Sequence, residues 1–294
     1  RPFETIVGPA AAPCQSPRGG AGVRIPPSMR LRTVTAALAA ACLSLPAAAI
    51  LTRADRDDEE YRELATRYPA AVPLGPPAGI GALIAPRWIL ASARRAEALR
   101  AARASVTIAG RACAVQEVFV HPDGKPGGEA GIALVFLREP VAGVEPAPIY
   151  RGGDEAGQAA RTVGIGASGR IGATLRGPAG ERRAAINTLD RVTGGPAGLP
   201  IKGPEGASDL QGALAADDDG APAFLEAGGR IFVGGIATRT EDASGDGIAG
   251  SVGDWEVFAR VSAFAGWIDD TMGKAAVEEA ARETAKPAVA GGRP

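Results

Sequence analysis

The sequence contains a single histidine, His121, among its 294 residues. A reaction that needs a positioned imidazole base must therefore use this residue, and a metal site built from several histidines is excluded. Ser92 and Ser208 could act as nucleophiles only beside a base, and no base can be assigned to either. We therefore expect both serines to be ordinary turn residues.

An acidic segment from Asp242 to Gly247 has the oxygen spacing that opens a calcium-binding loop. The twelfth position of such a loop carries a bidentate glutamate, but here it is Gly253, and no helical pattern flanks the segment. We expect a solvated turn here, and neither a metal nor a cofactor elsewhere in the chain.

Composition narrows the possible classes of protein. The chain is 46% hydrophobic and 22% charged, which is enough apolar material for a core and excludes a fully disordered chain. Its 41 Gly and 24 Pro follow no Gly-X-Y period, which excludes collagen and disfavours a helical bundle. Because 32 basic residues face 33 acidic ones and form no stripe, we expect no nucleic-acid partner.

Short apolar segments rich in β-branched residues and bounded by Gly or Pro predict an all-β fold. These segments are Gly79–Ile84, Trp88–Ala91, Ser105–Ile108, Ala112–Val120, Ile132–Leu137, Thr162–Ile165 and Ile231–Ile236. The stretch 226–230, with two central glycines, indicates a hairpin. The acidic run 55–60 is interpreted as a solvated face or the start of a short helix. Apolar spacing predicts a C-terminal helix over 261–272, followed by a polar helical extension and a loose tail over 273–294.

The N-terminal region is typical of a processed leader. Residues 1–28 have no periodicity and are interpreted as an upstream extension, whereas residues 29–49 have the basic start, short apolar stretch and small-residue end of a secretory signal. The apolar stretch is too short to span a bilayer. A lipoprotein anchored at Cys42 is the alternative, although Ala39 stands where a large aliphatic residue is usual. We predict a secreted or periplasmic protein that begins at Ile50, without a transmembrane segment.

Four strings, in family order between residues 50 and 272, resemble the trypsin-like serine peptidases. They are Gly79–Arg94, His121-Pro122 with Gly131–Leu134, Asp217–Pro222, and Val257–Ser262 leading to Trp267. The resemblance implies two antiparallel β-barrels of six strands each, roughly over 50–155 and 156–260, with the C-terminal helix closing the second barrel. It also places His121 outside the catalytic triad, as a partly exposed loop residue.

The resemblance implies that this chain has lost the catalytic triad. Arg94 stands in place of the histidine base, Gly131 in place of the aspartate and Asp219 in place of the serine nucleophile. A guanidinium remains protonated near neutral pH, and a carboxylate beside an oxyanion hole would repel the charge that develops in acyl transfer. Asp217 also replaces the glycine expected at the oxyanion hole. We therefore expect no useful acyl-transfer catalysis.

Opposite charges at two of these positions predict a new contact. Arg94 and Asp219 should form an ion pair within about 4 Å, with the long arginine using the volume that Gly131 vacates. The alternative is that Arg94 points into solvent. By the same resemblance, Asp218 would receive the N-terminal ammonium of Ile50 after leader cleavage, although Leu51 and Thr52 depart from the usual glycine-rich continuation.

These observations lead to one functional expectation and two alternatives. We expect an exported, catalytically inactive peptidase homologue that binds a protein or peptide in or around the cleft between the barrels. The first alternative is an active trypsin-like endopeptidase with a divergent active site, and the second is a structural, envelope-associated protein.

Overall fold

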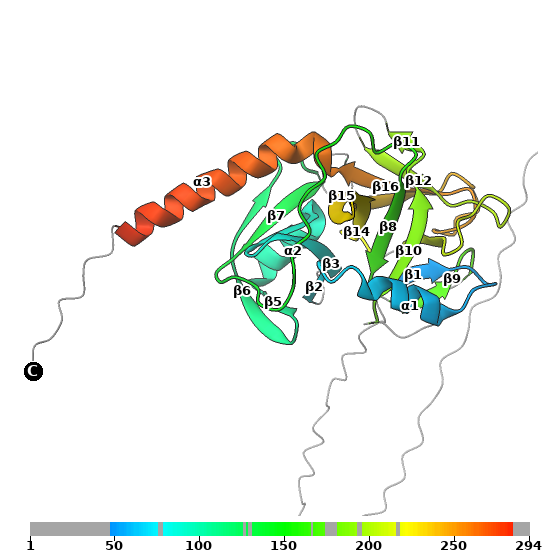
Figure 1. The fold of residues 1–294 in the computed structure, drawn as a ribbon, viewed down its shortest axis with the longest axis horizontal. Helices are drawn as coiled ribbons and strands as arrows, with labels where there is room; N and C mark the ends of the chain where they lie inside the picture. The colour runs from blue at the N-terminus through cyan, green and yellow to red at the C-terminus, as the bar shows by residue number, and fades with distance from the viewer. Residues whose placement is uncertain are drawn as a thin grey trace, which may run out of the picture. The chain divides into compact units, whose positions relative to one another are not determined.

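The structure is a computed structural model. It describes residues 48–75, 79–125, 128, 131–165, 167–173, 181–192, 196–215 and 218–284, all within one compact unit. The predicted upstream extension and all but the last two residues of the predicted signal segment lie outside the described residues, as does Asp217. The described chain is mostly β, with two large antiparallel sheets and a C-terminal helix (Figure 1).

The first sheet has six strands in the order β2-β3-β4-β7-β6-β5, all antiparallel. Their bounds are β2 Ala71–Gly75, β3 Gly79–Ala85, β4 Trp88–Ser92, β5 Ser105–Ile108, β6 Arg111–Val120 and β7 Ile132–Leu137. Strands β2 and β5, at the two ends of this order, also contact each other, so the sheet curls into a nearly closed barrel.

Continuous apolar runs in β4 and β7 follow from burial on both faces. Ile89 and Val135 belong to the core inside the first sheet, whereas their neighbours Leu90 and Leu134 belong to the larger core shared with the rest of the molecule. Because side chains alternate between the faces of a strand, each strand must be apolar throughout to serve two cores. This is why these segments were recognisable in the sequence as unbroken hydrophobic runs.

The second sheet is also antiparallel and has seven strands in the order β10-β8-β14-β15-β16-β12-β11. Their bounds are β8 Ala159–Gly164, β10 Arg183–Thr188, β11 Arg191–Val192, β12 Ala197–Pro200, β14 Pro222–Ala227, β15 Arg230–Glu241 and β16 Trp255–Arg260. The predicted hairpin joins β14 to β15 and is confirmed. Gly228 and Gly229 both have positive φ, the backbone conformation that a two-residue turn of this kind requires.

A third, small sheet holds the first described residues against the second half of the chain. Strand β1 (Ala48–Thr52) lies between β9 (Ala167–Arg170), to which it is parallel, and β13 (Gly212–Ala213), to which it is antiparallel. Ile50 is fully buried there. A β-carbon at position 212 would lie 2.7 Å from Ile50 Cγ2 and 2.8 Å from Leu51 O, so only glycine allows this close approach.

Among the described residues, two α-helices precede the C-terminal one. Helix α1 (Asp58–Thr66) begins within the predicted acidic run, and its Tyr61 hydroxyl donates a hydrogen bond to Gln211 O at 2.8 Å. Helix α2 (Ala93–Ala102) follows β4 directly. We had not predicted α2, although its alanine, arginine and leucine content favours a helix.

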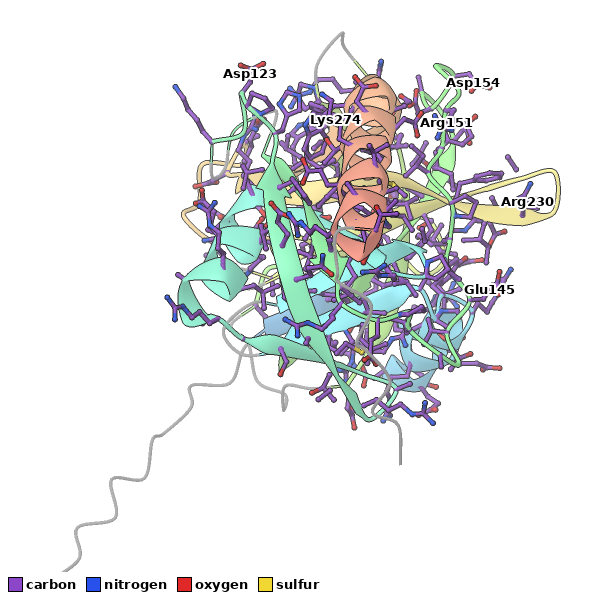
Figure 2. The ribbon with its side chains drawn as sticks, turned by 90° about the vertical axis from the view of Figure 1, so that its left-hand side faces the viewer. Asp123, Glu145, Arg151, Asp154, Arg230 and Lys274 are labelled. Carbon is purple, nitrogen blue, oxygen red and sulfur yellow. The ribbon has the colours of Figure 1, made fainter. Side chains whose placement is uncertain are left out.

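The C-terminal helix begins where the spacing predicted and continues further. A 3₁₀ turn (η1, Val261–Phe264) leads into α3 (Ala265–Thr284), so the predicted polar extension is helical as expected. Figure 2 looks at this side of the molecule and shows α3, with Lys274, in front of strands of the first sheet. Arg87 anchors the helix there: its guanidinium makes two bonds to the Glu279 carboxylate, at 2.6 and 2.8 Å, and lies 4.3 Å from the Phe136 ring centre.

Two glycine substitutions test this account of packing. Gly212→Ala should lower the free energy of unfolding by about 1–3 kcal/mol, because the new methyl group overpacks the contact with Ile50. Gly273→Ala, in the middle of α3 with no atom within 4 Å of its β-carbon, should raise it by about 0.5–1 kcal/mol. Urea unfolding of both variants measures the difference, and equal stabilities would contradict the described packing of β1.

Candidate functional site

The junction of β4 and α2 positions two arginines from the first half of the chain. The Ser92 side chain is buried and its Oγ accepts a hydrogen bond from Arg95 N at 3.3 Å, which caps the first turn of α2. Ser92 is therefore a helix-capping residue and not the turn residue that we expected. The cap fixes the direction in which Arg94 and Arg95 leave the helix.

A tight turn before β14 positions Asp219 from the second half of the chain. Gly220 has φ +93°, its N–H donates to Ala237 O at 2.9 Å, and a β-carbon there would lie 2.6 Å from Ile80 O of the first sheet. The turn is thus held between both large sheets and requires glycine at this position. It leaves the Asp219 side chain only 5% exposed.

The Asp219 carboxylate lies between the two arginines. Arg94 Nε is 2.5 Å from Asp219 Oδ2, and Arg95 Nε is 3.7 Å from the same oxygen and donates to the backbone Asp219 O at 3.1 Å. The predicted Arg94–Asp219 ion pair is confirmed, whereas the participation of Arg95 was not predicted. The Arg94 side chain is 53% exposed and that of Arg95 13%, so one guanidinium faces solvent while the other lies beneath it.

The space beside Gly131 is not used as we expected. The three atoms nearest to a β-carbon at this position are Gly128 O at 2.9 Å, Lys125 O at 3.1 Å and Thr238 Cγ2 at 3.5 Å, and Arg94 is not among them. Gly131 contributes instead through its backbone, because its carbonyl accepts a hydrogen bond from Ala93 N at 2.8 Å at the start of α2. An aspartate at position 131 would require the carbonyl groups of Lys125 and Gly128 to move.

The single histidine is a packing residue. The His121 ring lies edge-on to Phe264 and Trp267, with ring centres 5.0 and 5.1 Å away, and its Nδ1 accepts a hydrogen bond from Asp123 N at 3.2 Å. It therefore joins the end of β6 to η1 and the start of α3. As expected, it is a partly exposed loop residue.

Asp218 is buried directly beneath the turn that positions the Asp219 side chain. Its carboxylate accepts hydrogen bonds from Ala215 N at 3.1 Å and Ile165 N at 3.4 Å. Ile50 follows Ala48 and Ala49 in β1, so its nitrogen here belongs to a peptide bond. The contact between an Ile50 ammonium and Asp218 therefore remains a prediction for a cleaved chain.

Another buried acidic residue is Glu256 of β16, and its burial was not predicted from the sequence. Its Oε1 accepts a hydrogen bond from Leu214 N, its Oε2 has no hydrogen-bond partner, and the residue is fully buried. Burial raises the pKa of Glu256 from 4.5 to about 8, the Leu214 hydrogen bond opposes this, and the nearby Asp218 charge adds to it. The only signal was an acidic residue inside a short apolar strand.

The other candidate segments have structural roles. Asp242 accepts hydrogen bonds from Gly245 N at 2.8 Å and Gly247 N at 3.0 Å, which closes the exposed turn that we expected. Ser208 donates from its hydroxyl to Ile186 O. In the part of the chain that the structure describes, no three His, Cys, Asp or Glu residues are grouped to hold a metal ion, and no helix is long and apolar enough to cross a membrane.

Comparison with known proteins gives no relative: no protein-family model matches the chain, and no curated protein matches it. The two barrel-like antiparallel sheets are consistent with a chymotrypsin-like fold. Beyond this class of fold, the site must be interpreted from its own geometry.

The two arginines of the site should differ in their effect on stability. Arg94→Ala should lower the free energy of unfolding by less than about 1 kcal/mol, because the Arg94 side chain is half exposed and Arg95 still faces the Asp219 carboxylate after the change. Arg95→Ala should lower it by about 1–3 kcal/mol, because the largely buried Asp219 would lose both a carboxylate partner and a backbone hydrogen bond. Chemical unfolding measures both, and a larger loss for Arg94→Ala would contradict the described arrangement.

Glu256 should make stability depend on pH. Its folded pKa lies above its unfolded value, so the folded state binds the extra proton and the stability present at low pH declines between about pH 4.5 and 8. Glu256→Gln cannot titrate, and the difference in unfolding free energy between wild type and variant should change steadily over this range. Denaturation at several pH values gives that difference, and a constant value would contradict the assignment.

Proposed function

We propose that the protein is an inactive homologue of trypsin-like serine peptidases that binds a protein or peptide beside the Arg94–Asp219 pair. The observation that carries the proposal is the pair itself. The Asp219 carboxylate lies 2.5 Å from the Arg94 guanidinium, and by the sequence resemblance these two groups replace the hydroxyl and the imidazole of a peptidase of this family. The guanidinium remains protonated near neutral pH and cannot act as the base, and the carboxylate would repel the negative charge that develops in acyl transfer.

The half-exposed guanidinium supports a role in binding. Arg94 uses Nε toward Asp219, and its side chain is 53% exposed. Arginine presents several N–H donors in a rigid plane, which suits carbonyl and carboxylate groups of a peptide. The pair therefore supplies a fixed, solvent-accessible donor at the junction of the two large sheets, and we expect the ligand to contact it there.

The predicted export fits the same proposal, because a binding module derived from a peptidase would meet its partners outside the cytoplasm. The proposed leader over 29–49 would deliver the domain to the periplasm or the exterior. We further propose that cleavage leaves Ile50 as the new N-terminus and that its ammonium stabilises the Asp218 turn.

The absence of peptidase activity is tested directly. The purified domain should neither react with a serine-directed fluorophosphonate probe nor hydrolyse fluorescently labelled casein, because His121, the single imidazole, packs against Phe264 and Trp267 and is bonded to no serine among the described residues. Trypsin processed in parallel is the positive control. Casein cleavage that disappears when one serine, such as Ser92 or Ser208, is changed to alanine would establish the alternative, an active endopeptidase.

Binding is tested with a displayed peptide library selected on the wild-type domain. Selected peptides should bind Arg94→Ala at least tenfold more weakly, which corresponds to about 1.4 kcal/mol of lost contact. Arg151→Ala is the matched control, because Arg151 is similarly exposed and pairs with Asp269 on α3 instead. Equal affinity for the wild type and Arg94→Ala would contradict binding at the pair, and retention of the exported protein with membranes would favour the envelope-associated alternative.

A further inference from the structure

A hollow of about 330 Å³ lies toward the end of β14 that is opposite to the candidate site. Its floor is apolar and comes from Ile231 and from Tyr68 and Phe224, whose rings stack with their centres 5.1 Å apart. Its walls are the loop 67–70, the segment 145–148 between the two large sheets, and the β14–β15 hairpin. Small-molecule sites have volumes of this order and are likewise mostly apolar, with a few polar groups that orient the ligand.

The walls of the hollow are held in place by the rest of the chain. Ala147 N donates a hydrogen bond to Leu83 O at 3.0 Å, and Pro148 O accepts one from Val233 N at 2.9 Å. Pro146 and Pro148 also fix their own backbone φ angles. The hollow is therefore preformed, and a ligand that enters it need not order the protein around it.

Two charged side chains at the rim have no charged partner in the part of the chain that the structure describes. Glu145 and Arg230 both line the hollow and are exposed, and neither forms an ion pair or a side-chain hydrogen bond with a described residue. The Arg230 guanidinium lies 5.3 Å from the Phe232 ring centre, so the ring supports it at the edge of the hollow. Figure 2 shows Arg230 on the β14–β15 hairpin and Glu145 below it, on the same side of the molecule.

The third charged side chain that lines the hollow, Arg67, is already engaged. It pairs at 3.1 Å with the Glu226 carboxylate, which also accepts a hydrogen bond from the Tyr68 hydroxyl at 2.6 Å and lies 3.5 Å from Arg161. A ligand in the hollow therefore meets one free carboxylate, one free guanidinium and an apolar floor.

We propose that this hollow binds a short apolar peptide by both of its charged ends. The Arg230 guanidinium binds the terminal carboxylate, the Glu145 carboxylate binds the terminal ammonium, and the apolar side chains of the peptide lie on the floor. A zwitterion complements both unpartnered charges, whereas a ligand with one charged end leaves the other charge unsatisfied. The site contains neither Arg94 nor Asp219, so it is additional to the proposed function.

The probe is the dipeptide leucyl-phenylalanine, titrated into wild type and followed by NMR. Amide shifts should change in 67–70, 145–148 and 229–231. The N-acetylated and the C-amidated dipeptides should each bind about tenfold more weakly, because each loses one charge-assisted contact. Equal binding of the three forms would overturn the proposal, as would shift changes that lie elsewhere or none at all.

Two variants assign the ends of the peptide. Arg230→Gln should bind the free dipeptide about tenfold more weakly than wild type does, but bind the C-amidated form equally well. Glu145→Gln should show the same behaviour toward the N-acetylated form. Arg111→Gln is the matched control, because Arg111 is also exposed and without an ion pair among the described residues but lies on β6. A variant that weakens all three ligands equally would contradict the assignment of that end.

Arg94→Ala separates this site from the proposed function. It should bind leucyl-phenylalanine as wild type does, because Arg94 does not line the hollow. Loss of dipeptide binding in Arg94→Ala would place the ligand at the Arg94–Asp219 pair and overturn the second site. If instead no library peptide depends on Arg94, the proposed function fails while the dipeptide titration still decides this proposal.

Discussion

The need to balance the buried charge of the Asp219 carboxylate is the main constraint on the junction of the two large sheets. A charge with its side chain 5% exposed must be balanced, and both balancing guanidiniums come from the first turn of one short helix in the other half of the chain. The Ser92 cap, the Gly131 carbonyl and the Gly220 backbone conformation serve to bring these groups together. Each of them acts on the main chain, the first through the Ser92 side chain and the other two through backbone groups, so the site depends on main-chain geometry as much as on its charged side chains.

The predicted strands were recognisable because their physical causes are local, whereas strands such as β2 (Ala71–Gly75) and β10 (Arg183–Thr188) were not predicted. Apolar runs ending at Gly or Pro located Ser105–Ile108 and Ile132–Leu137 at their observed bounds. Helix α2 was not predicted because its helical pattern is short and directly follows a buried strand. In addition, the family resemblance concerned position 94 and not the residues that follow it. The C-terminal helix was found because its apolar spacing spans several turns.

The candidate site was predictable only where two residues carry complementary charges. Opposite charges at 94 and 219 indicated a pair, but nothing local showed that Arg95 would join it. Gly131 was misinterpreted because the carbonyl oxygens of Lys125 and Gly128, which occupy the space beside it, cannot be placed from sequence. The burial of Glu256 depends on Leu214, 42 positions away, and such long-range coverage has no sequence signal.

The position of β1 bears on how the chain reaches its native state. This strand pairs with β9 and β13, although Leu51 is separated by more than a hundred residues from both of its partners, Gly169 and Ala213. Contacts so distant along the chain form slowly, because the chain loses the entropy of closing a large loop before it gains the stabilising contacts. During synthesis from the N-terminus, the β1 segment must therefore wait for its partners with its backbone groups unpaired. Strand β1, one of the first to be made, can therefore complete its small sheet only after the chain has been made as far as Ala213.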